Sequence, residues 1–151
     1  MRSIFRRTQG SALLLAFASL SLAGCASLMS SAASGLADNL SSAILNQDDP
    51  ETVRAGSPSY MLLLDSFLEG DPDNPELLAS AATLYASYGA VFADDPVRAS
   101  RLTTRARNYA QEAMCETYAA SCDWPDASYD EFVASLDGVT ARQSEYLYTY
   151  G

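Results

Sequence analysis

Apolar side chains recur at three- and four-residue steps along most of the chain, the spacing that places them on one face of an α-helix. The clearest run lies between Pro75 and Phe92 and includes Leu78, Tyr85 and Tyr88. A shorter run of the same kind, just ahead of an acidic turn, consists of Leu36, Leu40 and Ile44. No segment shows the period-two alternation of a half-buried strand. The pattern therefore predicts an all-α fold.

Helix starts are marked by a residue that can cap a helix, followed by proline. These are the preferred residue types for the N-cap and for the first helical position. The pair occurs four times, at Asp49-Pro50, Ser57-Pro58, Asn74-Pro75 and Asp95-Pro96. Glycine 70 is a stop signal for the second of these segments. Together these signals predict helices over residues 50–55, 58–69, 75–92 and 96–118.

The C-terminal region carries two further helix signals. Ser128 and Glu131 have the spacing of a capping box, which predicts a helix that runs through Leu136. A new aromatic-rich pattern then begins at Ser144 and stops with the sequence. Because a helix that stops there has nothing to cover its last face, we expect this sequence to be the N-terminal part of a longer protein.

Antiparallel helices joined by short turns predict an α-solenoid of tetratricopeptide-like helical hairpins over residues 34–151. The best unit is the hairpin 75–118, with bulky apolar residues in its first helix and alanines in its second. Its connections are longer than that repeat permits and its usual glycine and proline are missing, so a plain helical bundle is the alternative. On the second helix of this hairpin, Arg98, Arg101 and Arg105 are predicted to be solvated.

The N-terminus has the three parts of a secretory signal, namely positive charge, an apolar run over residues 12–22 and small residues after it. The apolar run is too short to span the membrane, because a spanning helix needs about 20 residues. We therefore predict a cleaved signal peptide over residues 1–24.

The cleavage point, Leu22-Ala23-Gly24-Cys25, looks like the lipobox of bacterial lipoproteins. It predicts that Cys25 becomes the lipidated first residue, held to the membrane by several acyl chains. The alternative is an ordinary signal with a chance cysteine. Residues 25–33 are rich in serine and alanine and predict a flexible tether. The absence of aspartate after Cys25 resembles lipoproteins sorted to the outer membrane, so we expect a periplasmic, lipid-anchored protein there.

The net negative charge of the chain argues against two kinds of partner, nucleic acids and anionic lipid surfaces. The chain has nine Lys and Arg residues and 19 Asp and Glu residues, and three of the arginines lie in the predicted signal. The mature chain would therefore carry six arginines and a net charge of −13. So acidic a chain repels phosphate backbones and anionic lipid surfaces, which argues against nucleic-acid binding and leaves the lipid as the only membrane attachment.

Catalytic and metal-binding chemistry have little basis in the sequence. The chain has no histidine, the commonest general base and metal ligand, and no recognisable catalytic motif. Two aspartate pairs, Asp71/Asp73 and Asp94/Asp95, lack the spaced oxygen ligands of a calcium loop and are interpreted as helix caps. We therefore predict a protein that is not an enzyme and that has neither a metal site nor a cofactor.

Cys115 and Cys122 would lie in an oxidising compartment if the chain is exported, and a disulfide is then the expected state. Seven residues of continuous helix would separate their Cα atoms by about 10.5 Å, beyond the ~7 Å limit for a bridge. The helix must therefore end near Tyr118 to Ser121 for the bond to form. Two unpaired buried thiols are the alternative.

Several stretches go beyond generic helix signals. They are the segment from Asp49 to Asp65, with Arg54, Gly56 and Tyr60 at fixed spacings, followed by Pro75-x-Leu77-Leu78, Ala81-Ala82-x-Leu84-Tyr85-x-x-Tyr88 and Ala90-x-Phe92. Together with the lipobox, the tether and the order of the helices, they resemble the T component family of tripartite ATP-independent periplasmic (TRAP) transporters. The resemblance covers essentially all of the mature chain.

The resemblance implies a non-catalytic periplasmic lipoprotein, a homotrimer built from tetratricopeptide-like hairpins. Its implied partner is the periplasmic substrate-binding protein of a TRAP transporter, and its implied ligand is a hydrophobic small molecule. The alternative function is that of an outer-membrane, lipid-anchored scaffold for envelope assembly. Genes for TRAP permease subunits beside this one would favour the first function.

Five aromatic residues are the candidates for partner or ligand contact. Aromatic residues at helical spacing more often pack in the core, although a tyrosine hydroxyl needs a partner or an exposed edge. The candidates are Tyr60, Tyr85, Tyr88, Phe92 and Tyr109.

Overall fold

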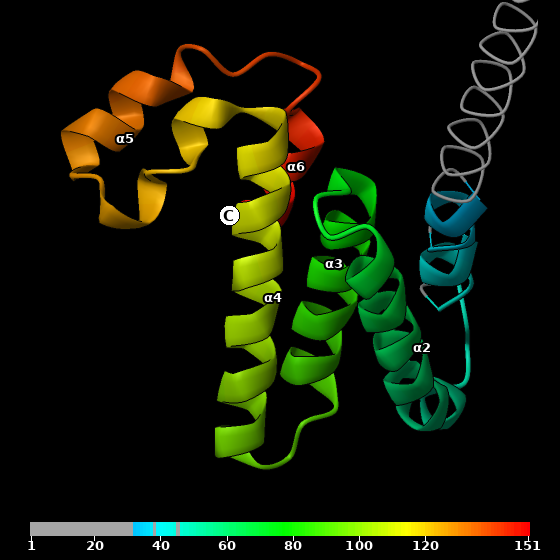
Figure 1. The fold of residues 1–151 in the computed structure, drawn as a ribbon. Coiled ribbons are helices and arrows are strands. Elements are labelled where there is room, and N and C mark those ends of the chain that lie inside the picture. Colours follow the sequence, from blue (N-terminus) through cyan, green and yellow to red (C-terminus); the bar gives the residue numbers. More distant parts are fainter. Residues whose placement is uncertain (1–31, 38, 45) are drawn as a thin grey trace, which may run out of the picture. The chain divides into compact units, whose positions relative to one another are not determined.

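The structure is a computed structural model that describes residues 32–151 apart from 38 and 45 (Figure 1). Residues Ser34–Gly151 form one compact unit. The predicted signal over residues 1–24 and the lipidation site at Cys25 lie outside the described residues. Residues 32 and 33, which we assigned to the tether, are helical, as suits a pair of alanines.

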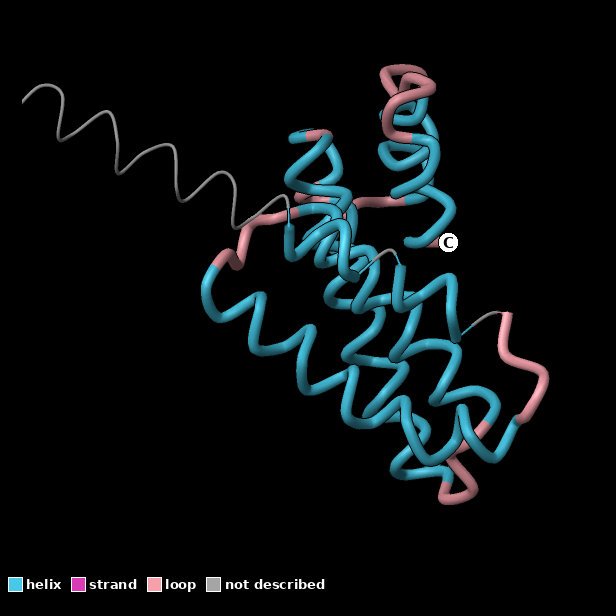
Figure 2. Tube along the Cα trace, turned by 90° about the vertical axis from the view of Figure 1, so that its right-hand side faces the viewer, coloured by secondary structure: helices cyan, strands magenta, loops and turns pink. Residues whose placement is uncertain are grey.

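All the regular secondary structure of the described residues is helical, and no strand occurs among them (Figure 2). The prediction of an all-α fold is therefore confirmed, whereas the tetratricopeptide-like solenoid stays a prediction. No helix in residues 32–151, as far as they are described, is both long and apolar enough to cross a membrane. Residues 32–37 and 39–44 are helical, and the later elements are α2 (Pro50–Gly70), α3 (Pro75–Val91), α4 (Pro96–Thr117), η1 (Ala119–Ser121), η2 (Trp124–Asp126), α5 (Tyr129–Leu136) and α6 (Ser144–Tyr150).

Helix α3 is the centre of the packing, with α4 along one side and α2 along another (Figure 1). The hairpin of α3 and α4 is close because small residues line the contact. A Cβ added at Gly89 would lie 3.1 Å from both Leu102 Cβ and Thr103 Cγ2. Burial falls on the faces that the apolar period predicts, and the fully or nearly buried residues include Leu77, Leu78, Ala81, Ala82, Ala106, Ala110, Ala113 and Met114.

Three of the four predicted proline starts are confirmed by their caps. The side chains of Asp49, Asn74 and Asp95 each accept a hydrogen bond from a backbone N–H in the first turn of α2, α3 and α4. The capping box of Ser128 and Glu131 is also confirmed at the start of α5. Local side-chain chemistry therefore sets these helix starts.

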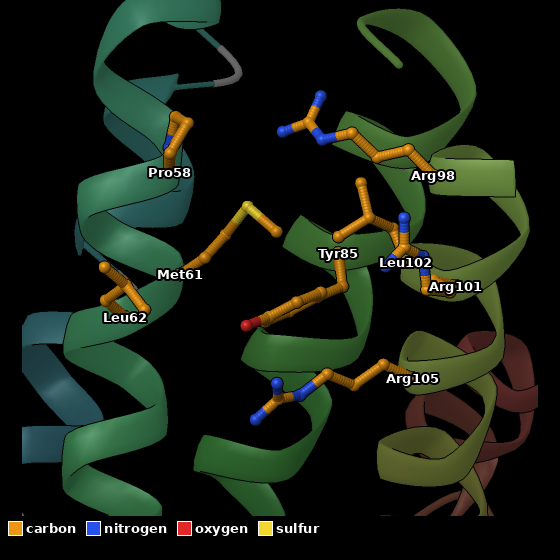
Figure 3. A pocket seen from close by; sticks show the side chains of 8 residues that line it. All are labelled: Pro58, Met61, Leu62, Tyr85, Arg98, Arg101, Leu102 and Arg105. Carbon is orange, nitrogen blue, oxygen red and sulfur yellow. The ribbon is translucent and has the colours of Figure 1, made fainter. Parts of the chain in front are cut away.

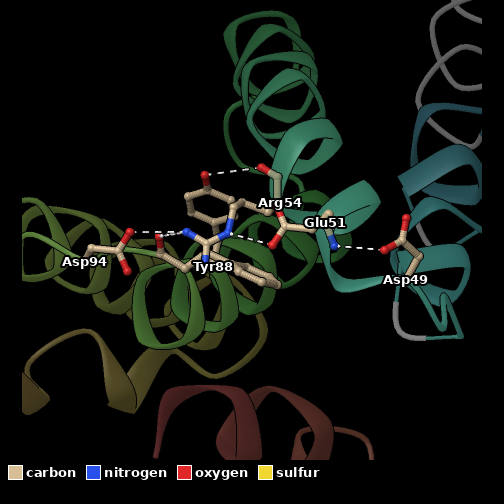
Figure 4. Close-up of polar contacts among 6 residues, drawn as sticks. Asp49, Glu51, Arg54, Tyr88 and Asp94 are labelled. Carbon is tan, nitrogen blue, oxygen red and sulfur yellow. Dashed lines mark hydrogen bonds and ion pairs between the residues drawn. The ribbon is translucent and has the colours of Figure 1, made fainter.

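The fourth proline start is wrong, because α2 continues through Pro58 as one helix from residue 50 to residue 70. Proline has no N–H for the carbonyl four residues earlier, that of Arg54. The hydroxyl of Tyr88 on α3 donates a hydrogen bond to that carbonyl at 3.4 Å (Figure 4). Ser57 does not cap a helix, and its buried Oγ has no hydrogen-bond partner among the described residues. The buried face of α2 begins at Ser57 and continues through Met61, so packing against α3 holds the helix together across the proline.

The C-terminal part is held by a disulfide and an aromatic cluster. Cys115 and Cys122 are bonded, with their Cα atoms 4.6 Å apart, because α4 ends at Thr117 and the chain turns into η1. The expected disulfide is therefore present in the structure. Trp124 lies 4.9 Å from the ring of Phe132, and its Nε1 donates to Ser135 Oγ at 2.7 Å.

The last helix has packing partners, contrary to our expectation from the sequence. Helix α6 contacts both α4 and α3, and the ring of Tyr150 lies 5.4 Å from that of Trp124. Tyr148 on the same helix is 87% exposed. Helix α6 therefore packs one face against its neighbours and exposes the aromatic ring of Tyr148 on another.

We expect Tyr88→Phe to lower the free energy of unfolding by about 1 kcal/mol, because it removes the hydrogen bond to the partly buried carbonyl of Arg54. Urea unfolding measures the loss. In a Pro58→Ala background, the new N–H can donate to that carbonyl, so Tyr88→Phe should cost clearly less. An equal loss in both backgrounds would show that the tyrosine does not compensate for the proline.

We expect the pair Cys115→Ala and Cys122→Ala to lower the free energy of unfolding by about 2 to 3 kcal/mol, since the bridge closes a short loop at the end of α4. The double variant, which has no disulfide to reduce, is the control for an experiment with a reducing agent. A reducing agent should lower the melting temperature of the wild type and leave that of the double variant unchanged. A wild-type melting temperature insensitive to reduction would contradict the prediction.

Candidate functional site

A cleft of about 450 Å³ lies between α2 and α4, with α3 as its floor (Figure 3). One wall is apolar and comes from α2, and the other comes from α4 and carries three guanidinium groups. Tyr85 rises between them from α3. The lining residues are Pro58, Met61, Leu62, Tyr85, Arg98, Arg101, Leu102 and Arg105.

The two walls run in the same direction because α2 and α4 are both antiparallel to α3. Arg98 lies across from Pro58 at one end of the cleft (Figure 3). Seven residues further along each helix, Arg105 forms an ion pair with Asp65, with Nη2 3.1 Å from Oδ2. The side chains of Arg98 and Arg105 both point toward α2 (Figure 3). For Arg105, this direction brings the guanidinium group to Asp65 on α2.

Asp65 joins the three helices at one end of the cleft. Its carboxylate accepts hydrogen bonds from the hydroxyls of Tyr85 at 2.7 Å and Tyr109 at 2.8 Å, in addition to the ion pair with Arg105. The Nε of Arg105 donates to the hydroxyl of Tyr109 at 3.0 Å, and its guanidinium lies over the rings of both tyrosines. The side chain of Asp65 is only 17% exposed, so these contacts are partly shielded from water.

The other two arginines of the cleft keep their charge unbalanced. Arg98 lies over the ring of Tyr88, 5.2 Å from its centroid, a cation–π contact that holds the side chain without neutralising it. Within the described residues the ion pairs involve Arg54 and Arg105, and none involves Arg98 or Arg101. Of the three guanidinium groups that line the cleft, only that of Arg105 forms an ion pair with a carboxylate of the described residues.

Three of the five aromatic candidates, Tyr85, Tyr88 and Tyr109, line the cleft or contact its arginines. Tyr85 lines it, and the ring of Tyr109 lies 5.8 Å from that of Tyr85 in an edge-to-face arrangement. Tyr88 supports Arg98 and packs against Phe92 at 5.5 Å. Tyr60 is not part of the group, because it lines a separate hollow with residues of the helix over 39–44.

The aromatic candidates are mostly supports rather than exposed contact surfaces. Tyr85 and Tyr88 are 4% and 6% exposed, so a ligand in the cleft would reach little of either ring. Phe92 lies under the guanidinium of Arg54, which also pairs with Asp94 at 3.2 Å (Figure 4). Core packing, the alternative that we weighed from the sequence, describes Tyr85 and Tyr88 better.

The arginines are the feature that our interpretation of the sequence missed. Arg98, Arg101 and Arg105 are exposed, as we expected, and all three also line the cleft. A signal was present, because positions 98, 101 and 105 share one face of a helix and hold half of the arginines predicted for the mature chain. What the sequence did not show was the apolar helix that faces them.

The two tyrosines that contact Asp65 are hydrogen-bond donors at neutral pH. Burial and the hydrogen bond to Asp65 raise the pKa of Tyr85, and burial raises that of Tyr109. Both phenols therefore keep their protons at neutral pH and act as donors to the carboxylate. Among the described residues, no group of three or more Cys, Asp or Glu side chains is placed to hold a metal ion.

We expect Tyr85 and Tyr109 to ionise above the ordinary tyrosine pKa of about 10. The folded state holds these protons more tightly than the unfolded state. The resulting stability is therefore complete below about pH 10 and is lost as the pH rises through the folded pKa values. Ultraviolet absorbance of phenolate measures the titration.

Asp65→Asn should bring the pKa values of both tyrosines closer to the ordinary value, because it removes the negative charge beside the hydroxyls while their burial persists. Tyr85→Phe and Tyr109→Phe assign the late transitions. Ionisation of Tyr85 and Tyr109 near pH 10 in the native protein would contradict the prediction.

Comparison with known proteins gives a family. The model of the family described as TRAP transporter T-component matches residues 46–151, a span that includes α2 to α6 and the whole cleft. The comparisons with curated proteins and with solved structures returned no match. Because the family match covers well over half of the chain, the protein belongs to the TRAP transporter T-component family and is an accessory component of such a transporter.

Proposed function

We propose that this protein docks the periplasmic substrate-binding protein of a TRAP transporter and offers the cleft between α2 and α4 to a ligand with an apolar part. Family membership supports the transporter partner. The observation that carries the ligand-binding role is the cleft itself. Its volume of about 450 Å³ falls within the ~300 to 1,000 Å³ of small-molecule sites, and its lining is apolar with a few convergent polar groups.

The mouth of the cleft supports a docking role as well. Leu62 is 69% exposed at its edge, a large apolar side chain for which the described residues provide no cover. Leucine in such a position contributes to binding when a partner removes it from water. A substrate-binding protein seated over this mouth would be able to exchange a ligand with the cleft.

The lipid anchor completes the proposal. Attachment through Cys25 would confine the docking module to the membrane surface, at the outer membrane, where a periplasmic partner reaches it by diffusion. The net negative charge then acts in solubility and in steering toward a basic patch on that partner.

A pull-down tests the docking role, using the chain from residue 26 onward made without its signal so that no lipid is added. We expect it to retain the substrate-binding protein encoded beside it. Leu62→Lys should weaken retention at least several-fold, because it places a charge in the proposed contact. Tyr148→Lys on α6 is the matched control, a second exposed apolar side chain changed in the same way.

Failure of the unaltered chain to retain its neighbour would overturn the docking role. Retention that Tyr148→Lys weakens and Leu62→Lys does not would overturn the placement of the partner over the cleft.

A further inference from the structure

We propose that a polar hollow formed by α3, α6 and the helix over residues 39–44 binds a small organic cation with a primary ammonium group, and that Glu76 and Glu145 balance its charge. The hollow has a volume of about 390 Å³, within the range of small-molecule sites. It shares no lining residue with the cleft between α2 and α4, so this inference is independent of the proposed function.

The first step is the polar face of α3. This helix buries apolar side chains against its neighbours, yet the face that lines the hollow carries one carboxyl and two hydroxyl groups. The residues of that face recur at helical steps, and they are Glu76, Ala79, Ser80 and Thr83. The central helix therefore turns polar side chains into the hollow and apolar side chains elsewhere.

The second step is the hydroxyl of Ser80 at the floor of the hollow. Ser80 is only 9% exposed, and its hydroxyl has no hydrogen-bond partner among the described residues. The hydroxyls of Thr103 and Thr117 on α4, in contrast, donate to carbonyls of their own helix. Because a hydroxyl removed from water without a partner is unfavourable, the unmet hydrogen bond of Ser80 points to a polar ligand.

The third step is the negative charge at the mouth. Glu76 and Glu145 are exposed and take part in none of the ion pairs of the described residues, although Arg142 lies three residues before Glu145. Each lies in the first turn of its helix, where the helix dipole favours a carboxylate. The dipole explains either carboxylate alone, but not why both line one hollow with Ser80 at its floor.

The fourth step is the match between this lining and an ammonium group. The remaining hydroxyls come from Ser41 and Ser42 on the helix over 39–44 and from Tyr146 and Thr149 on α6, and no arginine lines the hollow. Carboxylate and hydroxyl oxygens accept hydrogen bonds, and a primary ammonium has about three N–H donors and no acceptor. The hollow therefore offers acceptors and negative charge, which is what an ammonium group requires.

A metal ion fits the hollow less well than an organic cation. Calcium takes about six to eight oxygen ligands, of which several are usually carboxylates. Among the described residues, no three acidic side chains are placed to share one ion. Two carboxylates and several hydroxyls are better suited to a cation that brings its own hydrogen-bond donors.

Calorimetric titration of the chain from residue 26 onward tests the inference with three probes. 1,4-Diaminobutane carries two ammonium groups, 1,4-butanediol has the same carbon chain without charge, and calcium chloride supplies positive charge without N–H donors. We expect the diamine to bind about tenfold more tightly than either of the others, and increasing salt to weaken its binding.

Two double variants with the same change of net charge locate the site. Glu76→Gln with Glu145→Gln should weaken diamine binding about tenfold or more, because both carboxylates are lost. Glu51→Gln with Asp130→Asn is the matched control, since these acids also lie in the first turns of helices but do not line the hollow. It should leave binding unchanged, and melting temperatures show that both variants remain folded.

Ser80→Ala separates a ligand contact from a structural role. We expect it to weaken diamine binding several-fold without lowering the melting temperature, because the hydroxyl has no partner to lose and alanine is the better helix former. A lower melting temperature with unchanged binding would contradict the role of Ser80.

Each remaining outcome contradicts a separate part of the inference. Equal binding of the diol and the diamine would overturn the choice of a cation, and tighter binding of calcium would overturn the ammonium group. Equal weakening by both double variants would overturn the assignment to Glu76 and Glu145. Binding of none of the probes would overturn the site, while the docking role and the cleft between α2 and α4 would stand.

Discussion

The carboxylate of Asp65 is the contact on which the rest of the site depends. Helices α2 and α4 both pack on α3, and this carboxylate joins them by accepting hydrogen bonds from Tyr85 and Tyr109 and pairing with Arg105. Because the pair closes one end of the space between α2 and α4, the remainder of that space stays open as a cleft. The same pair leaves Arg98 and Arg101 without a counter-charge.

The helices could be predicted from the sequence because their signals are local. Asp49, Asn74 and Asp95 cap helices from within one turn, and the disulfide follows from the geometry of a short loop. Pro58 shows where local signals fail. The carbonyl that it leaves free is satisfied by Tyr88, 34 residues away in the sequence from Arg54, so a residue on another helix decides that α2 continues.

The cleft could not be predicted for the same reason. Three arginines on one face of a helix are compatible with a solvated surface until the neighbouring helix is known. Asp65 and Arg105 lie on different helices, and their meeting depends on both helices packing on α3. Of the aromatic residues chosen from the sequence, Tyr85 lines the cleft, and Tyr85, Tyr88 and Tyr109 contact two of its arginines.

Membership of the T-component family associates the protein with a TRAP transporter, and the cleft is the ligand site that we propose. The most direct test of that account is nuclear magnetic resonance of the arginine Nε–H groups during titration with the substrate-binding protein, since residues 26–151 contain only six arginines as reporters. The account predicts that the signals of Arg98, Arg101 and Arg105 in the cleft shift and saturate while those of Arg107 and Arg142 do not move. A uniform shift of all the arginines, or none at all, would contradict it.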